Sequence, residues 1–136
     1  MKELVWDNEL EAIAQRWTEQ CVGGHDSNRR KLDGTGVGQN GYSWGGGGTG
    51  VPAGVEPVQE AVRAWFSEVD DPGFRHNPGS TFSALHVQGT GHYTQVVWAD
   101  TEQVGCGKVV FRDGDWTKLH VMCNYAVAGN LIGGQM

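Results

Sequence analysis

Apolar residues recur at helical spacing near the start of the chain. The residues that would share one helix face are Leu10, Ile13, Ala14, Trp17 and Cys21. Their i, i+3, i+4, i+7 and i+11 spacing predicts an amphipathic helix within the first 21 residues. Asp7 or Asn8 is the expected N-cap, and Asn8 has Glu11 three positions later, as a capping box requires. Gly23-Gly24 is expected to end this helix.

A second helix is predicted from about Val55 to Val69. Its expected buried face consists of Val55, Val58, Val62, Trp65, Phe66 and Val69. Pro57 suits the first turn of a helix, where its missing N–H is not needed. Glu68 comes three residues after Trp65, so we expect it at the edge of the apolar face.

The last third of the chain has the composition of β-strands. Segments 93–98, 104–111 and 118–125 are rich in β-branched and aromatic residues. We expect them to form a three-stranded antiparallel unit, with a hairpin turn at Asp113-Gly114-Asp115. Segment 37–44 has the pattern of one short strand, whereas the glycines of 45–50 favour a mobile loop. These elements predict an α/β (α+β) domain with helices packed on a small antiparallel sheet.

Length and charge narrow the classes of function. A chain of 136 residues with six Trp is long enough for one domain with an ordinary core. The net charge of -6 argues against nucleic-acid or anionic-membrane partners, which need a basic patch. No apolar run reaches the length of a membrane span, and Met1-Lys2-Glu3 does not begin a signal peptide. A leader removed earlier, or a longer N-terminus, stays open.

The three cysteines are an odd set. Cys106 and Cys123 fall at the inner ends of two predicted neighbouring strands, which suggests a cross-strand disulfide and leaves Cys21 unpaired. The alternative is three buried, reduced thiols in a cytosolic protein. We expect a monomer, although an exposed Cys21 would permit a covalent dimer.

Local motifs for chemistry are few. His25, His76 and His92 lie near predicted turns or strand ends, whereas His86 and His120 have apolar neighbours. The sequence lacks His-Glu-x-x-His and Cys-x-x-Cys, which carry common zinc sites. Gly41-Tyr-Ser-Trp-Gly45 matches Gly-x-Ser-x-Gly in spacing, but it lies in the predicted strand 37–44 and the glycine run after it, so it is not the strand-to-helix elbow of a serine hydrolase. From these residues alone, the purpose of the domain stays open.

Longer segments resemble a known family. Gly91-His-Tyr-Thr-Gln-Val-Val-Trp-Ala-Asp-Thr101 resembles the first signature of the CAP superfamily, which groups cysteine-rich secretory, antigen 5 and pathogenesis-related class 1 proteins. His120-Val-Met-Cys-Asn-Tyr-Ala-Val-Ala-Gly-Asn-Leu131 resembles the second signature and departs from it at Val127. Segments 4–17 and 104–107 also look like the family, so residues 1–136 resemble one CAP-like domain of the antigen 5-like branch.

The resemblance implies a three-layer α-β-α sandwich with a central cleft. By motif position, the cleft residues are His25, Gln39, Glu68 and His92, with Gln39 where many members carry Glu. Asn28 stands where antigen 5-like proteins commonly have the cysteine that bridges to Cys21. The family's first helix is missing from this chain, so the chain resembles a family member truncated at its N-terminus.

This cleft permits limited chemistry. His25 and His92 would bind zinc or another divalent cation, although no cofactor is required, and Gln39 removes one negative charge that would favour a cation. The leading hypothesis is a secreted, extracellular binding protein of the venom, saliva or defence type. Its partner would be a protein target or a lipid (sterol or fatty acid), recognised through segments 41–54 and 73–91. The alternatives are a metal-assisted hydrolase or protease using His25, Glu68 and His92, and a structural domain whose cleft is vestigial.

Overall fold

The computed structural model describes residues 2–48, 50–51, 53–54, 56–70, 81–83 and 89–136. Its elements follow in the order β1 (Val5–Trp6), α1 (Asn8–Thr18), β2 (Gly38–Gly47), α2 (Pro57–Ser67), the short 3-10 helix η1 (Glu68–Asp70), α3 (Gly91–Val96), β3 (Gln103–Asp113) and β4 (Trp116–Ala126).

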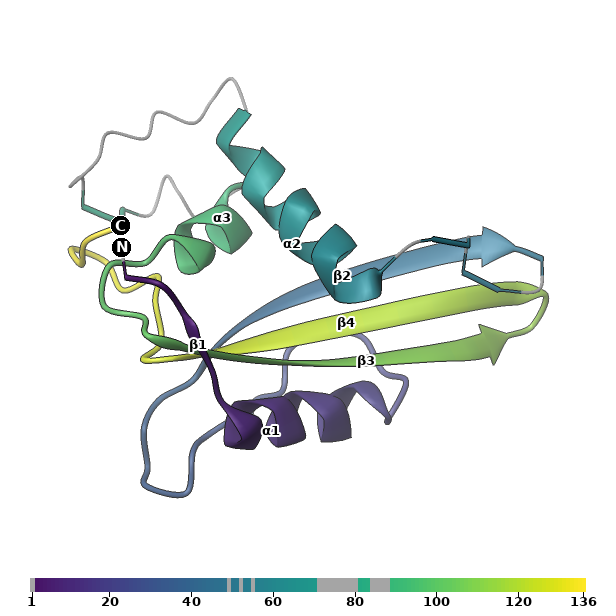
Figure 1. Ribbon diagram of the computed structural model, residues 1–136, viewed down its shortest axis with the longest axis horizontal. Helices are drawn as coiled ribbons and strands as arrows, with labels where there is room; N and C mark the ends of the chain where they lie inside the picture. The colour runs from purple at the N-terminus through teal and green to yellow at the C-terminus, as the bar shows by residue number, and fades with distance from the viewer. Residues whose placement is uncertain (1, 49, 52, 55, 71–80, 84–88) are drawn as a thin grey trace.

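The strands form one sheet in the order β1-β3-β4-β2, and helices lie on both of its faces. Figure 1 shows α1 on one side of the sheet and α2 with α3 on the other, which gives the expected three layers. The long strands pair antiparallel, whereas β1 pairs with β3 in parallel. The sheet is therefore mixed, and the prediction of a purely antiparallel sheet was wrong at β1.

Helix α1 lies directly on the backbone of β3 at two glycines. A Cβ on Gly105 would lie 2.2 Å from the backbone nitrogen of Glu11, and a Cβ on Gly107 would lie 2.3 Å from that of Gln15. Leu10 and Ala14 are fully buried at this contact. The helix therefore approaches the sheet more closely than any side chain at these two β3 positions would allow.

Helix α1 begins after one of the two predicted N-caps, but its capping box and its C-terminal end differ from the prediction. Asp7 is the N-cap, its carboxylate accepting a hydrogen bond from Leu10 N at 2.9 Å, whereas Glu11 accepts from the Trp6 indole instead of completing a capping box. The helix ends at Thr18, before Cys21, because the chain turns away with Cys21 in the left-handed region (φ 55). Cys21 therefore does not extend the apolar face of α1, and residues 5–6 belong to a strand.

Asp7 also fixes the loop that follows α1. Lys31 Nζ lies 2.7 Å from Asp7 Oδ2, and both side chains are about nine-tenths buried (11% and 12% exposed). Hydrogen bonds from Lys31 and from Leu10 N, together with the positive charge of Lys31, hold the pKa of Asp7 below its usual value. This ion pair joins the start of α1 to the chain leading into β2.

Helix α2 covers the opposite face with a narrower stripe than predicted. The main core cluster combines Ala61 and Trp65 of α2 with sheet residues Cys106, Leu119, Val121, Cys123 and Tyr125. Val62 and Phe66 are instead 38% and 51% exposed, so their predicted burial was wrong. The edge of the helix that carries Val58, Ala61 and Trp65 packs against the sheet, with Val58 partly buried, and Val55 lies outside the described residues.

The predicted strand at 93–98 is wrong, because Gly91–Val96 forms α3. The Glu68 carboxylate accepts hydrogen bonds from the backbone N–H groups of His92 and Tyr93, which satisfies two of the free donors in the first turn of the helix. The Thr94 hydroxyl donates back to Gly91 O, within the helix. The two contacts with Glu68 come from a distant part of the chain, and together with the local contact of Thr94 they outweigh the β propensity of the segment.

The third long strand of the sheet is β2, which extends through three residues predicted to be loop. Gly45, Gly46 and Gly47 pair with Lys118, Thr117 and Trp116 of β4. A Cβ on Gly46 would lie 2.5 Å from the Trp44 ring, so the indole occupies the space above a glycine. The β4 ladder supplies the hydrogen bonds that hold this glycine run extended.

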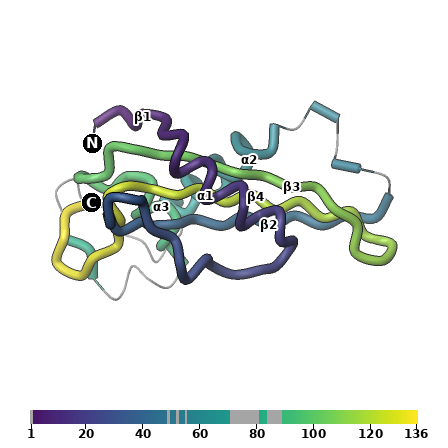
Figure 2. Tube along the Cα trace, turned by 90° about the horizontal axis from the view of Figure 1, so that it is seen from below, coloured from purple at the N-terminus to yellow at the C-terminus, as the bar shows by residue number. Residues whose placement is uncertain are grey.

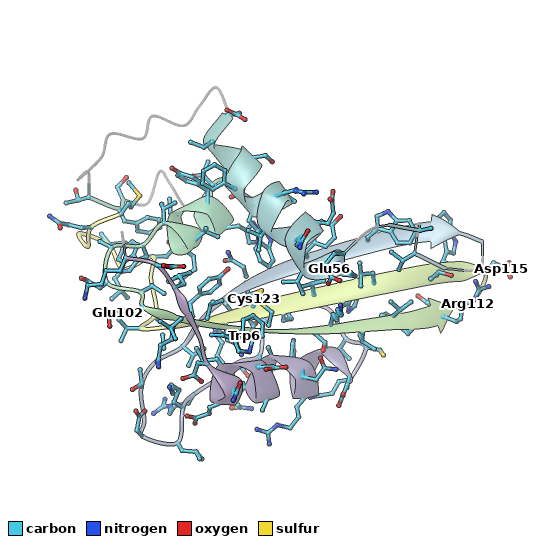
Figure 3. All side chains as sticks on the ribbon, viewed as in Figure 1. Trp6, Glu56, Glu102, Arg112, Asp115 and Cys123 are labelled. Carbon is cyan, nitrogen blue, oxygen red and sulfur yellow. A yellow bond between two sulfur atoms is a disulfide. The ribbon has the colours of Figure 1, made fainter. Side chains whose placement is uncertain are left out.

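The hairpin between β3 and β4 was predicted at the right place. Asp113 pairs with Trp116, and Gly114 has a φ of 59° in the two-residue loop between them. Figure 3 shows Arg112 and Asp115 at this tip, beyond the helices, and Glu102 toward the other end of β3. Among the described residues, no helix has the length and apolar character to cross a membrane.

Candidate functional site

A pocket of about 300 Å³ opens at the β2 edge of the sheet. Its lining consists of His25, Gln39, Asn40, Glu68, Gly89, Gly91, His92 and Asn130. His25 comes from the loop after α1, Gln39 and Asn40 from the start of β2, Glu68 from η1, and His92 from α3. The four cleft residues implied by the family resemblance therefore line one pocket. His76 and His86 lie outside the described residues.

His25 is held by an amide. Its Nδ1 lies 3.0 Å from Gln39 Oε1, which also accepts the backbone N–H of Asp26 at 3.0 Å. The Gln39 Nε2 donates to Asn124 Oδ1 at 2.9 Å, within the buried sheet. These bonds fix which atom of Gln39 faces the ring, so in the neutral imidazole of His25 the proton lies on Nδ1 and Nε2 has the free lone pair.

His92 is held by a carboxylate in the same way. Its Nδ1 lies 2.7 Å from Glu68 Oε1, while Glu68 Oε2 accepts the backbone N–H groups of His92 and Tyr93 at 3.1 and 2.9 Å. The His92 ring also stacks on Trp65, with centroids 6.2 Å apart and an interplanar angle of 23°. Glu68 thus orients the ring and caps α3 at once, and Nε2 of His92 is left for a ligand.

Two asparagines that sequence reasoning did not single out complete the wall of the pocket. Asn40 Nδ2 donates to His92 O at 3.0 Å, and Asn130 Nδ2 donates to Gly91 O at 2.8 Å. Asn130 lies within the second signature segment and takes a left-handed backbone (φ 59), a conformation that Asn tolerates. Asn40 directly follows Gln39 in the predicted strand 37–44. The segments of both asparagines were considered from the sequence, but a role was predicted only for neighbouring residues.

Asn40 of the pocket contacts the core residue Tyr125. The Tyr125 hydroxyl lies 3.5 Å from Asn40 Nδ2, and the residue is 2% exposed. Burial raises the pKa of this phenol, and the Asn40 hydrogen bond offsets part of that rise. Tyr125 is therefore neutral at physiological pH and acts in the site as packing beneath Asn40.

The pocket offers two imidazole ligands to a cation. The His92 side chain is 41% exposed and Glu68 is 20% exposed. Within the ranges that the structure describes, no group of three or more His, Cys, Asp or Glu is placed to hold a metal ion. A metal bound by His25 and His92 alone would complete its coordination with water, whereas structural zinc sites usually have four protein ligands.

The other histidine predicted in apolar surroundings, His120, lies away from the pocket on β4. It is 8% exposed, and the Phe111 ring meets it edge-on at 4.9 Å between centroids. Its Nδ1 is buried and has no hydrogen-bond partner in the described part of the chain. Burial, aided by the positive charge of Lys118, lowers the pKa of His120.

The cysteines are arranged as the strand pattern predicts. Cys106 and Cys123 face each other across β3 and β4 and form a disulfide. Cys21 is free and exposed. The alternative of three buried, reduced thiols is therefore wrong.

The chain is similar to venom allergens 5 and 3 over nearly its whole length. It is 41% identical over 130 residues to venom allergen 5 of Vespula flavopilosa, covering 96% of this chain and 59% of that protein. It is 43% identical to venom allergen 5 of Microctonus hyperodae (96% and 54%) and 40% identical to venom allergen 3 of Solenopsis invicta (98% and 55%). The chain thus spans slightly more than half the length of these relatives.

Solved structures match the fold as well. BmVAL-1 superposes with a TM-score of 0.77 at 30% identity, covering 97% of this chain and 62% of that one. The crystal structure of NaASP2 with Zn2+ gives a TM-score of 0.71 at 30% identity (99% and 65%). The model of the CAP family, the cysteine-rich secretory protein family, matches residues 1–125. With this match and these relatives, the chain belongs to the CAP family, on the side of the venom allergens 5 and 3.

Proposed function

We propose that this chain is a secreted binding protein whose His25–His92 pocket binds one divalent cation weakly. The observation that supports this proposal is that the two histidine rings have the same hydrogen-bond arrangement at Nδ1. Nδ1 of each imidazole faces an oxygen acceptor, Gln39 Oε1 or Glu68 Oε1, and both residues line the same pocket. Metal-binding histidines in proteins usually show this arrangement, in which an outer acceptor fixes the tautomer and the other nitrogen binds the metal.

The residues fit a borderline cation such as zinc. Imidazole nitrogens suit zinc, copper and nickel better than magnesium or calcium, which prefer oxygen. His25 and His92 would hold the ion, which would attract anionic or carbonyl groups of a partner to this edge of the sheet. With two protein ligands and Glu68 as the one carboxylate in the described lining of the pocket, we expect affinity in the micromolar range or weaker, about -8 kcal/mol at most. One of the similar solved structures is the crystal structure of NaASP2 with Zn2+.

The contacts of Glu68 favour binding over hydrolysis. Its carboxylate already accepts hydrogen bonds from the His92 ring and from two backbone N–H groups. A general base must reach its substrate with a free lone pair at hydrogen-bond distance. These contacts use three of the roughly four acceptor positions of the carboxylate and fix its orientation toward His92 and α3, and we therefore assign Glu68 an orienting role. The hydrolase alternative, which needs Glu68 as base, has less support than the binding proposal.

A zinc titration tests the metal part of the proposal. The background is Cys21→Ser, because the exposed Cys21 thiol is itself a zinc ligand. Calorimetry should show one saturable site that either His25→Ala or His92→Ala removes, with the circular dichroism of the folded chain preserved. Gln59→Ala, an exposed change on α2, is the matched control and should bind zinc as the parent does. Saturable binding that survives both histidine changes would contradict the assignment.

Secretion and the partner class complete the proposal. The disulfide suits an oxidising compartment, and the relatives are venom allergens. We propose that the partner is a protein target or a lipid (sterol or fatty acid), and that the chain is monomeric. Exposed apolar side chains suited to either partner include Phe66 (51%) and Ile132 (77%). The predicted recognition segment 73–91 lies mostly outside the described residues, and 41–47 is strand.

A co-elution experiment separates the two partner classes. Labelled cholesterol or palmitate should leave a gel-filtration column with the chain if a lipid is bound, and Phe66→Ser should reduce that fraction if α2 contributes. Failure of both lipids at micromolar protein would leave a protein target. A native mass of one chain in Cys21→Ser would support the monomer, and a stable non-covalent dimer would contradict it.

A further inference from the structure

A second pocket lies on the outer side of α1, apart from the histidine pocket. It has a volume of about 390 Å³ and is lined by Ile13, Arg16, Trp17, Gln20, Asp26, Asn28 and Arg30. Figure 2 shows the chain between α1 and β2 running back alongside α1, and the pocket lies between the two. It shares no lining residue with the pocket around His25 and His92.

Arg16 and Arg30 have no acidic partner among the described residues, and unlike Arg29 and Arg112, which also lack one, they leave their terminal guanidinium N–H groups without an acceptor there. The described lysines and Arg63 all form ion pairs: Lys2 with Glu102, Lys31 with Asp7, Arg63 with Glu60, Lys108 with Glu56, and Lys118 with Asp113. Arg16 uses only its Nε, toward Ala12 O at 3.2 Å. Arg30 has no side-chain hydrogen bond or ion pair within the described ranges. In a chain of net charge -6, two unpaired guanidinium groups therefore face one hollow.

The walls of the pocket are held in place. Trp17 Nε1 donates to Gly24 O at 3.0 Å, which fixes the indole on α1. On the loop side, Arg29 donates to Asp26 O and Val37 O at 2.6 and 2.8 Å, and the largely buried ion pair of Lys31 with Asp7 anchors the residue after Arg30. The loop that carries Arg30 is therefore ordered before any ligand binds, which lowers the entropy lost on binding.

We propose that this pocket binds a small organic anion, a phosphate or sulfate ester of an aromatic ring. Guanidinium groups donate paired N–H bonds that match a tetrahedral oxyanion, and the side-chain amide of Asn28 adds a donor. The Trp17 ring offers a surface on which a flat ring stacks. Asp26 and the C-terminal end of α1 add negative potential, so we expect a Kd of about 1 to 10 mM for a minimal ligand.

The probes are phenyl phosphate and phenyl sulfate. Inorganic phosphate, which has the oxyanion without the ring, and phenol, which has the ring without the oxyanion, are the controls. The readout is the indole N–H signal of Trp17 in a nitrogen-15 correlation spectrum at low salt, assigned with Trp17→Phe. We expect saturable shifts with an aryl ester, weaker binding of inorganic phosphate, and none with phenol. Stronger binding of phenyl phosphate would identify a phosphate ester as the ligand class, and stronger binding of phenyl sulfate a sulfate ester.

Charge-neutral variants test the assignment. Arg16→Gln and Arg30→Gln should each weaken binding of the better ester about tenfold, because each removes one charge-assisted contact. Arg63→Gln makes the same change in net charge on α2 and should leave the Kd unchanged. Both pocket arginines are exposed, so the variants should keep the parent's unfolding midpoint. No saturable shift, equal weakening by Arg63→Gln, or binding of phenol as tight as that of the esters would each overturn the proposal.

Discussion

Gln39 Oε1 lies 3.0 Å from Nδ1 of His25, in the same relation that Glu68 Oε1 has to Nδ1 of His92 at 2.7 Å. Both acceptors set the tautomer of a histidine in one pocket, but only Glu68 carries a charge. Each histidine of the pocket therefore has an oxygen acceptor at Nδ1, an amide oxygen for His25 and a carboxylate oxygen for His92. This asymmetry leads directly to a test of what the missing charge does.

Gln39→Glu should strengthen zinc binding and weaken the fold. A carboxylate at this position adds one negative charge behind His25, and we expect about a tenfold gain in zinc affinity. It would also place an oxygen against Asn124 Oδ1, where Gln39 Nε2 now donates at 2.9 Å in a buried site. The free energy of unfolding should therefore fall by about 1 to 3 kcal/mol.

Calorimetry with zinc and urea unfolding at pH 7, both in the Cys21→Ser background, measure the two effects of Gln39→Glu. Gln59→Glu is the control, since it makes the same charge change at an exposed position of α2. Equal gains in zinc affinity for both variants would mean that overall charge, and not the contact with His25, sets the affinity.

Glu68→Ala should loosen the start of α3. The change removes the acceptor of two backbone N–H groups and of the His92 ring, so we expect a loss of about 2 to 3 kcal/mol in unfolding free energy. Hydrogen exchange should accelerate most at the amides of His92 and Tyr93. Glu60→Ala, which breaks only the exposed pair with Arg63 at 3.9 Å, should change stability by less than about 0.5 kcal/mol. Similar losses for the two variants would contradict the capping role of Glu68.

The parts of the fold that could be predicted are those with a local cause. The apolar stripe through Leu10 and Ala14 predicts α1, because that face is buried wherever the helix packs. The turn at Gly114 predicts the β3–β4 hairpin, because few residues adopt its backbone. The strand register that places Cys106 opposite Cys123 follows from that turn.

The errors arose where a distant group decides the structure. Residues 93–98 have strand composition, yet Glu68, 24 positions before His92, supplies the acceptor that starts a helix there. Gly45–Gly47 looks like loop until β4 pairs with it. The pocket residues were reached through the family resemblance, and Asn40 and Asn130 were missed because their role is to hold backbone atoms of α3, which periodicity does not reveal.

Removing the disulfide should destabilise the chain, whereas removing the free thiol should not. Cys106 and Cys123 are 17 residues apart, and closing a loop of this size contributes about 3 kcal/mol, so Cys106→Ala/Cys123→Ala should lower unfolding free energy by that amount. Cys21→Ser alters an exposed side chain and should leave the free energy of unfolding unchanged. Titration of the native protein with a thiol reagent should detect one thiol per chain, and two or more would contradict the pairing.

Stability should fall on mild acidification because of His120. Burial lowers the pKa of this histidine in the folded state, so below about pH 6.5 the unfolded chain binds a proton that the folded chain does not. The stabilisation is complete above the unfolded pKa and is lost as the pH falls from there through the folded pKa. His120→Leu keeps an apolar group against Phe111 and removes the proton site, so the difference in unfolding free energy between pH 7.5 and pH 5 should shrink. Lys118→Met removes the positive charge that is the second cause of the lowered pKa of His120, and it should reduce the difference in unfolding free energy between the two pH values by less. Urea unfolding at the two pH values measures each difference, and an undiminished difference in His120→Leu would assign the acid sensitivity to other groups.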